Sequence, residues 1–156
     1  MGWDLEPLEQ EGCLVLLNPE LDYRAVRAGE FNIKGLQAVL AGMPLREAIE
    51  AARARGSRYL AGDFEKWGAR DDFEVIGRIL SPACYVEDAV PAVIHLARKY
   101  AADPEEGLVA NTMVGGDNCY RGTVLGALLG AATGPEGWPE RWREGLMVRP
   151  DLPLSA

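Results

Sequence analysis

The residues best suited to chemistry lie near the start of an expected helix, where two glycines precede an acid. Gly115 and Gly116 form a turn, and Asp117 takes the position of a helix N-cap. The carboxylate of Asp117 could cap the helix, or it could bind a hard metal ion or help to form an anion site at the helix mouth. Arg121 could contact a phosphate or pair with an acid. Both interpretations of this segment, capped turn and ligand site, stay open.

Other reactive side chains are scattered along the chain. The single histidine, His95, stands between apolar neighbours in an expected helix, which indicates a packing or surface role rather than general-base catalysis. The three cysteines, Cys13, Cys84 and Cys119, lack the close spacing of zinc ligands, so a zinc site with His95 is disfavoured. An odd number of cysteines fits a reducing cytoplasm.

Helical periodicity and turn residues predict that an all-α fold positions these side chains. We expect helices over residues 19–26, 32–40, 45–52, 63–80, 86–100, 104–113 and 123–132, and a last short helix from residue 139. Gly29 is expected to end the first of them, and residues 13–17 form the one candidate strand. Glycines at 122, 126 and 130 lie on one helix face, which predicts a close packing partner and self-association of the chain.

The order of these features resembles a known signature. Residues 115–131 read GGDNCYRGTVLGALLGA, and WPERW follows at 138–142. This succession of glycine turn, acid, glycine-faced helix and tryptophan loop resembles the C-terminal signature of the ADP-ribosylglycohydrolase family, and residues 86–92 resemble the preceding helix. The tryptophans of the loop could pack the last helix or stack on adenine.

The resemblance implies an orthogonal multi-helix bundle with a binuclear magnesium site. Its expected activity is hydrolysis of the glycosidic bond that joins ADP-ribose to a protein side chain, with ADP-ribose or ADP-ribosylated protein as the partner. On this basis Asp117 is a Mg²⁺ ligand, and Gly115, Gly116 and Arg121 contact the substrate. Magnesium would also bring an anionic nucleotide sugar to an acidic protein.

Two departures from the family pattern shape this expectation. The positions of the second acid and its following threonine hold Cys119 and Tyr120, and a thiol is a poor ligand for magnesium. The acidic motifs that supply the other ligands do not occur in residues 1–86. We therefore expect one domain, residues 1–149, equivalent to the C-terminal part of the family domain, and a flexible tail over 150–156. It would act with a complementing N-terminal half or as a homo-oligomer; the alternative is an inactive ADP-ribose-binding or crystallin-like structural relative.

Composition limits the functional classes to which the protein could belong. The 156 residues carry a net charge of −8, and 48% of them are hydrophobic. An acidic chain without basic clusters does not hold nucleic acid or anionic lipid by charge alone. The most apolar stretch, residues 124–132, is far shorter than the roughly 20 residues that a membrane span needs. A soluble, cytoplasmic protein is therefore expected.

Overall fold

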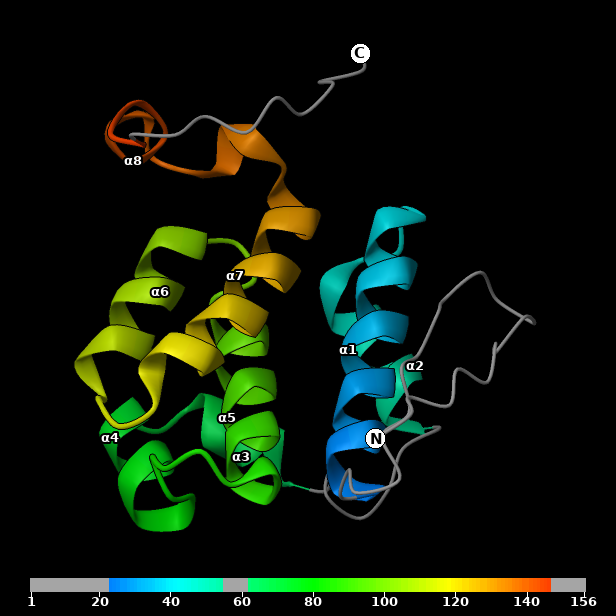
Figure 1. Cartoon of the computed structure of the whole chain (residues 1–156), viewed down its shortest axis with the longest axis vertical. Coiled ribbons are helices and arrows are strands. Elements are labelled where there is room, and N and C mark those ends of the chain that lie inside the picture. Colours follow the sequence, from blue (N-terminus) through cyan, green and yellow to red (C-terminus); the bar gives the residue numbers. More distant parts are fainter. Residues whose placement is uncertain (1–22, 55–61, 147–156) are drawn as a thin grey trace, which may run out of the picture.

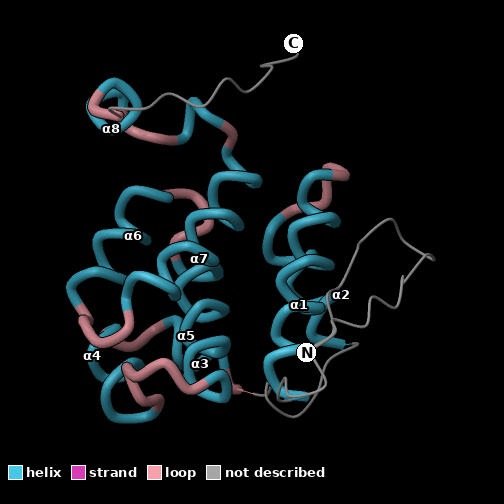
Figure 2. Tube along the Cα trace, viewed as in Figure 1, coloured by secondary structure: helices cyan, strands magenta, loops and turns pink. Residues whose placement is uncertain are grey.

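The structure is a computed structural model that describes residues 23–54 and 62–146, and these residues form helices joined by short loops (Figures 1 and 2). Within these ranges the β structure is limited to one isolated bridge between Ile76 and Leu80. The expected all-α class is confirmed. The elements in chain order are α1 (Tyr23–Leu40), α2 (Leu45–Ala54), α3 (Phe64–Gly68), α4 (Asp72–Glu74), the π-helical turn η2 (Val75–Ile79), α5 (Val86–Lys99), α6 (Pro104–Met113), α7 (Asn118–Thr133), the 3₁₀ turn η3 (Pro135–Gly137) and α8 (Glu140–Glu144).

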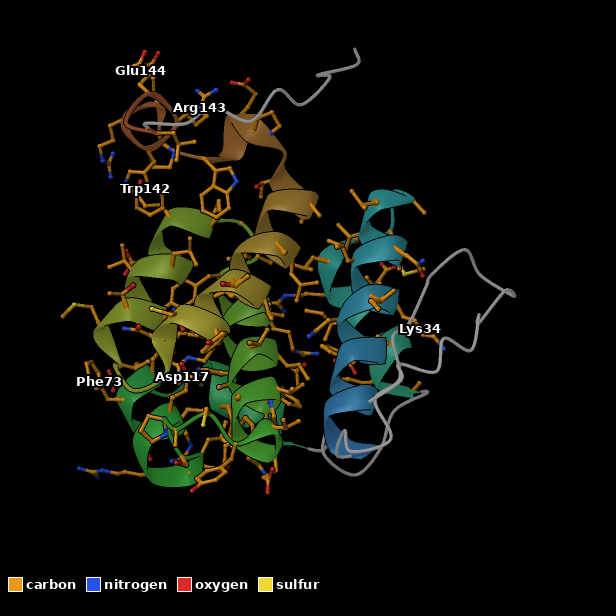
Figure 3. All side chains as sticks on the ribbon, in the orientation of Figure 1. Lys34, Phe73, Asp117, Trp142, Arg143 and Glu144 are labelled. Carbon is orange, nitrogen blue, oxygen red and sulfur yellow. The ribbon has the colours of Figure 1, made fainter. Side chains whose placement is uncertain are left out.

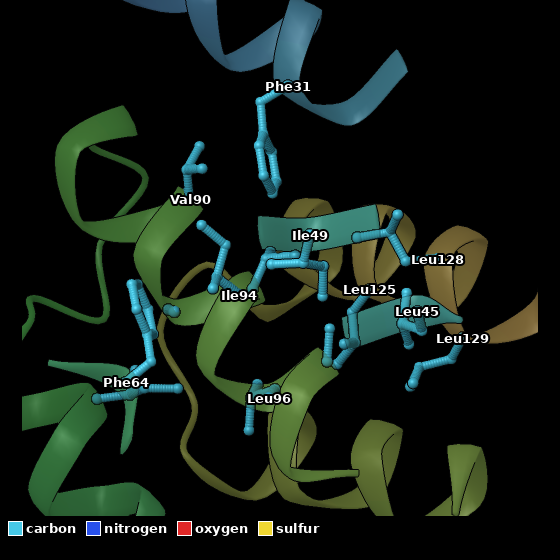
Figure 4. Close-up of a cluster of buried hydrophobic side chains, with 14 of the residues drawn as sticks. Phe31, Leu45, Ile49, Phe64, Val90, Ile94, Leu96, Leu125, Leu128 and Leu129 are labelled. Carbon is cyan, nitrogen blue, oxygen red and sulfur yellow. The ribbon is translucent and has the colours of Figure 1, made fainter. Parts of the chain in front are cut away.

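Helix α5 is the centre of the molecule. It packs against α1, α2, α3, α6 and α7, and all of its residues from 90 to 98 are buried. Nine consecutive buried residues cover every side of a helix, so other elements surround this part of α5. Figure 4 shows Ile94 and Leu96 of α5 among buried side chains from the other helices, including Leu125 of α7. Polar side chains on α5 are therefore enclosed as well, which matters for the sites described below.

Two predicted helices match the structure closely. In α2 the buried residues are Leu45, Ala48, Ile49 and Ala52, the stripe expected from helical spacing. In α6 the Asp103 carboxylate accepts a hydrogen bond of 3.0 Å from the backbone N–H of Glu106, as a capping-box start predicts. Local propensity and packing agree in both segments.

The expected helix end at Gly29 is wrong, because α1 continues through it to Leu40. A glycine inside a helix costs about 1 kcal/mol relative to alanine. Burial of Phe31 and Val39 of the same helix against the core outweighs this cost. The expected helix start at residue 19, the candidate strand 13–17 and the tail 150–156 lie outside the described residues.

The expected single helix over 63–80 is also wrong, since this segment divides into α3, α4 and η2. The Asp71 carboxylate accepts a hydrogen bond of 2.9 Å from the N–H of Phe73 and so starts a new helix. Gly77, at φ 154°, interrupts the helical path again. As a result Phe73 and Ile79 are 54% and 43% exposed.

The glycine face of α7 packs within the chain. A Cβ atom on Gly122 would lie 2.9 Å from Asn111 Nδ2, and one on Gly130 would lie 3.3 Å from Trp138 Nε1. Between them, Gly126 faces the side chain of Leu108. The close partner predicted from the glycine spacing is thus α6 together with Trp138, and the glycines do not require a second chain.

Candidate functional site

A tight turn between α6 and α7 forms the centre of the predicted site. Gly115 and Gly116 have φ values of 70° and 67°, a left-handed conformation that favours glycine. A Cβ atom on Gly116 would lie 2.1 Å from the carbonyl oxygen of Pro82, which approaches from the loop before α5. At Gly115 the same position has no described atom within 4 Å. The two glycines therefore differ: Gly116 admits the Pro82 loop, and Gly115 leaves open space.

Asp117 occupies the N-cap position of α7 without capping the helix through its side chain. Its backbone N–H donates a hydrogen bond of 2.9 Å to the Pro82 carbonyl. Its carboxylate makes no cap hydrogen bond to the described N–H groups of the first helical turn, unlike that of Asp103 in α6. In Figure 3 the labelled Asp117 lies at the start of α7. Its carboxylate oxygens are therefore available to an external ligand.

Arg121 holds this turn from the inside of the protein. The residue is 3% exposed, and its guanidinium donates to the Gly115 carbonyl at 2.7 Å. It also donates to the side chain and the carbonyl of Asn111, at 2.6 Å and 3.2 Å. Burial lowers the pKa of Arg121, and the nearby charge of Asp117 raises it in part. The side chain that was expected to contact a phosphate or an acid is thus bonded to oxygens of the turn and of α6.

Asn111 is a structural residue that sequence reasoning missed. It is 2% exposed, and besides accepting from Arg121 it donates 2.9 Å to the carbonyl of Asn118. It therefore ties α6 to the start of α7. The only signal in the sequence was one amide side chain on an otherwise apolar face of the helix. An amide at that position becomes informative only when its hydrogen-bond partners are known.

Gly115, Gly116 and Asp117 lie in one turn, and the Arg121 guanidinium bonds to this turn from α7. The neighbouring residues Cys119 and Tyr120 are exposed, Tyr120 to 78%. Sites of substrate contact at Gly115, Gly116 and Arg121, and of metal binding at Asp117, stay predictions.

The donor set of this turn fits a hydrated Mg²⁺ ion only in part. Magnesium keeps several waters and takes one or two carboxylates together with substrate oxygens, and the free Asp117 carboxylate suits that role. Within residues 23–54 and 62–146, however, no three His, Cys, Asp or Glu side chains come together as a metal-binding group. Among the described residues the turn thus offers one candidate carboxylate ligand, that of Asp117.

A second polar cluster, which sequence reasoning also missed, joins α4 to α5. The Asp72 carboxylate, in a residue 8% exposed, accepts hydrogen bonds from His95 Nε2 at 2.8 Å, Lys99 Nζ at 2.9 Å and the Tyr100 hydroxyl at 2.6 Å. Burial alone would raise the pKa of Asp72, but these three hydrogen bonds outweigh it and hold the pKa well below its usual value. Burial and the bond to Asp72 raise the pKa of Tyr100 above its ordinary range. The cluster is a buried ionic latch between two helices separated in sequence.

Fold and site together define an all-α protein with a glycine turn and, at the start of a helix that packs on the core, an acid that does not cap that helix. The chain matches the family model of the ADP-ribosylglycohydrolases over residues 21–154, and it therefore belongs to the ADP-ribosylglycohydrolase family. No curated protein and no solved structure matches it. None of the described helices is both long and apolar enough to cross a membrane.

Proposed function

We propose that this chain binds ADP-ribose, free or attached to protein, at the Asp117 turn together with Mg²⁺, and that it takes part in hydrolysis of the bond between ADP-ribose and a protein side chain. The observation that carries the proposal is the Asp117 carboxylate. It stands at the N-cap of α7 yet leaves the first N–H groups of that helix uncapped. A free carboxylate beside a positive helix end can hold a cation and an anionic group together.

Because the protein is acidic, we expect a metal ion to bridge it to the anionic ADP-ribose. With a net charge of −8, the chain repels a pyrophosphate at long range. When bound, Mg²⁺ supplies local positive charge and orients the attacking water. The chain's own contribution is to hold the backbone of the turn that carries Asp117, through the Pro82 carbonyl and Arg121, and to leave open space at Gly115.

We further propose that catalysis requires acidic groups from a complementing chain or segment. The described part of the turn offers one carboxylate, and the position two residues on is the exposed thiol of Cys119. A second chain or a second copy could supply the missing oxygen ligands. The expected activity of the isolated chain is therefore binding without turnover.

Titration with ADP-ribose, with and without Mg²⁺, tests the binding step. We expect Mg²⁺-dependent binding that Asp117→Asn abolishes. Asp103→Asn is the matched control, because Asp103 is also the N-cap of a helix but its carboxylate is engaged by Glu106. Equal binding by Asp117→Asn and the unchanged protein would remove Asp117 from the site.

A release assay on arginine- or serine-linked ADP-ribosylated protein tests the catalytic step. The chain alone should release no ADP-ribose. Metal-dependent release by this chain would show that it needs no complementing part.

A non-catalytic relative is the second candidate, and exposed Tyr120 and Cys119 favour it. Such a protein would keep the helical scaffold and bind ADP-ribose or serve a structural role. It predicts ADP-ribose binding that is independent of Mg²⁺, or no binding, in the same titration. Dependence on Mg²⁺ therefore separates the two candidates.

A further inference from the structure

A cavity of about 290 Å³ lies where α2, α3 and the end of α5 meet. Three of its lining side chains are cations, Arg46, Arg98 and Lys99, and one is an acid, Glu65. Cations therefore outnumber acids among the lining residues, while Glu50 and Asp72 pair with Arg98 and Lys99 from outside the lining. None of the four residues predicted for the Asp117 site lines the cavity.

His95 also lines this cavity and has an unsatisfied ring nitrogen. The residue is 1% exposed. Because the ionised Asp72 carboxylate can only accept, His95 Nε2 donates the hydrogen bond that joins them. The other nitrogen, Nδ1, is buried and has no partner among the described residues. A buried polar atom without a partner is costly, so Nδ1 is a candidate to bond a group that enters the cavity beside His95.

The cations around the cavity can receive an anion without a large rearrangement. Arg46 is exposed and forms no ion pair within the described residues. Arg98 is buried and pairs with Glu50 and Glu65, of which Glu65 has a side chain 81% exposed. An exposed carboxylate contributes little to a pair and is easily displaced. Lys99 is already paired with Asp72, and its side chain adds a further positive charge to the cavity wall.

We propose that this cavity binds a phosphate group, either as inorganic phosphate or as the phosphate of a small monoester. The guanidinium group of arginine presents paired N–H donors that match the oxygens of phosphate. Arg46 and Arg98 bring two such groups to the cavity from two different helices. In the bound state Nδ1 takes a proton from dihydrogen phosphate or from the monoanion of the monoester, which binds as the dianion. His95 is then an imidazolium that donates Nε2–H to Asp72 and Nδ1–H to the phosphate. Glu65 then leaves Arg98 and turns to solvent. The proposal is independent of the function proposed for the Asp117 turn.

The single histidine of the chain provides a direct spectroscopic readout. In protein labelled with ¹⁵N-histidine, long-range ¹H–¹⁵N spectra report both ring nitrogens of His95. Inorganic phosphate should move Nδ1 to the position of a protonated nitrogen, and sodium chloride at equal ionic strength should not. Absence of a phosphate-dependent change at Nδ1, or an equal change with acetate, would overturn the proposal.

Calorimetric titration with inorganic phosphate and, separately, ribose 5-phosphate identifies the source of the phosphate group. Binding of both supports the proposal, binding of the monoester alone assigns part of the affinity to its organic portion, and binding of neither contradicts it. Arg46→Ala should weaken binding about tenfold, the size of one hydrogen bond to a charged group. Glu65→Gln should tighten binding about threefold, because it removes the competing carboxylate.

Two controls separate this site from general charge and from the Asp117 turn. Arg78 is an exposed arginine of η2 that does not line the cavity, so Arg78→Ala should leave the affinity unchanged. Equal losses in Arg46→Ala and Arg78→Ala would show a non-specific effect and overturn the assignment. Asp117→Asn should bind phosphate normally even if it fails to bind ADP-ribose, which keeps the two proposals distinguishable.

Discussion

The two glycines of the turn before α7 form a matched pair whose alanine variants should differ strongly in stability. Both have nearly the same left-handed φ, 70° and 67°, so alanine at either position costs about 1–2 kcal/mol of backbone strain. At Gly115 the added Cβ meets no described atom, and that is the whole expected cost. At Gly116 it would lie 2.1 Å from the Pro82 carbonyl oxygen, a contact that forces the loop away. Overpacking of this kind costs a further 1–3 kcal/mol, roughly.

Urea unfolding of the two variants measures this difference. We expect Gly115→Ala to lower the free energy of unfolding by about 1–2 kcal/mol and Gly116→Ala by about 2–5 kcal/mol. The difference between the variants isolates the contact with Pro82, since the backbone term is common to both. Equal destabilisation, or a smaller loss in Gly116→Ala, would refute the reasoning that the Pro82 loop fills the space under this glycine.

Four further substitutions test the hydrogen bonds of Arg121, the Asp72 latch and the divided segment. Arg121→Met should lower the free energy of unfolding by about 2–4 kcal/mol, because it leaves the oxygens of Asn111 and of the turn without a donor; a loss below about 0.5 kcal/mol in urea unfolding would contradict this. Because folding lowers the pKa of Asp72, its ionised form stabilises the fold above about pH 4, and the gain is lost as the pH falls. Asp72→Asn should therefore differ more from the unchanged protein at pH 7 than at pH 3, and a constant difference would exclude the latch as its cause. Ile76→Ala should cost about 2–5 kcal/mol and Phe73→Ser less than about 0.5 kcal/mol, whereas one continuous helix would make both costly.

Sequence reasoning succeeded where local signals and packing point the same way. The apolar stripe of α2 and the capping acid of α6 are visible in a window of ten residues, and both are present in the structure. The turn at Gly115 and Gly116 was also predictable, because two adjacent glycines before an N-cap acid specify a left-handed turn. These features depend on the backbone preferences of neighbouring residues.

It failed where the outcome depends on competing terms of similar size. In the segment 63–80 the apolar spacing favoured one helix, but Asp71 offers a cap and Gly77 adopts φ 154°. Each of these effects is about 1 kcal/mol, comparable to the helix propensity gained by continuing. At Gly29 the balance went the other way and the helix continued. Periodicity alone cannot decide between such alternatives.

The polar clusters could not be predicted for a different reason. The bond between Asp72 and His95 joins residues 23 positions apart, and Arg121 reaches the Pro82 carbonyl 39 positions away. Residue type gave equal weight to a phosphate or an acid as the partner of Arg121. Only the packing of α7 against α6 and the Pro82 loop shows that its donors face carbonyl and amide oxygens.

This arrangement bears on how a ligand or a complementing chain would reach Asp117. The inner side of the turn is closed, because the Pro82 carbonyl lies under Gly116 and Arg121 bonds to Gly115. The outer side is open, since Gly115 faces empty space and Tyr120 is exposed three residues after Asp117, on a neighbouring part of the helix surface. Because the inner side of the turn is held by these contacts, the backbone that carries Asp117 is already ordered before a ligand binds. Binding therefore costs little conformational entropy there. A ligand or complementing chain that reaches Asp117 would therefore approach from the outer side of the turn.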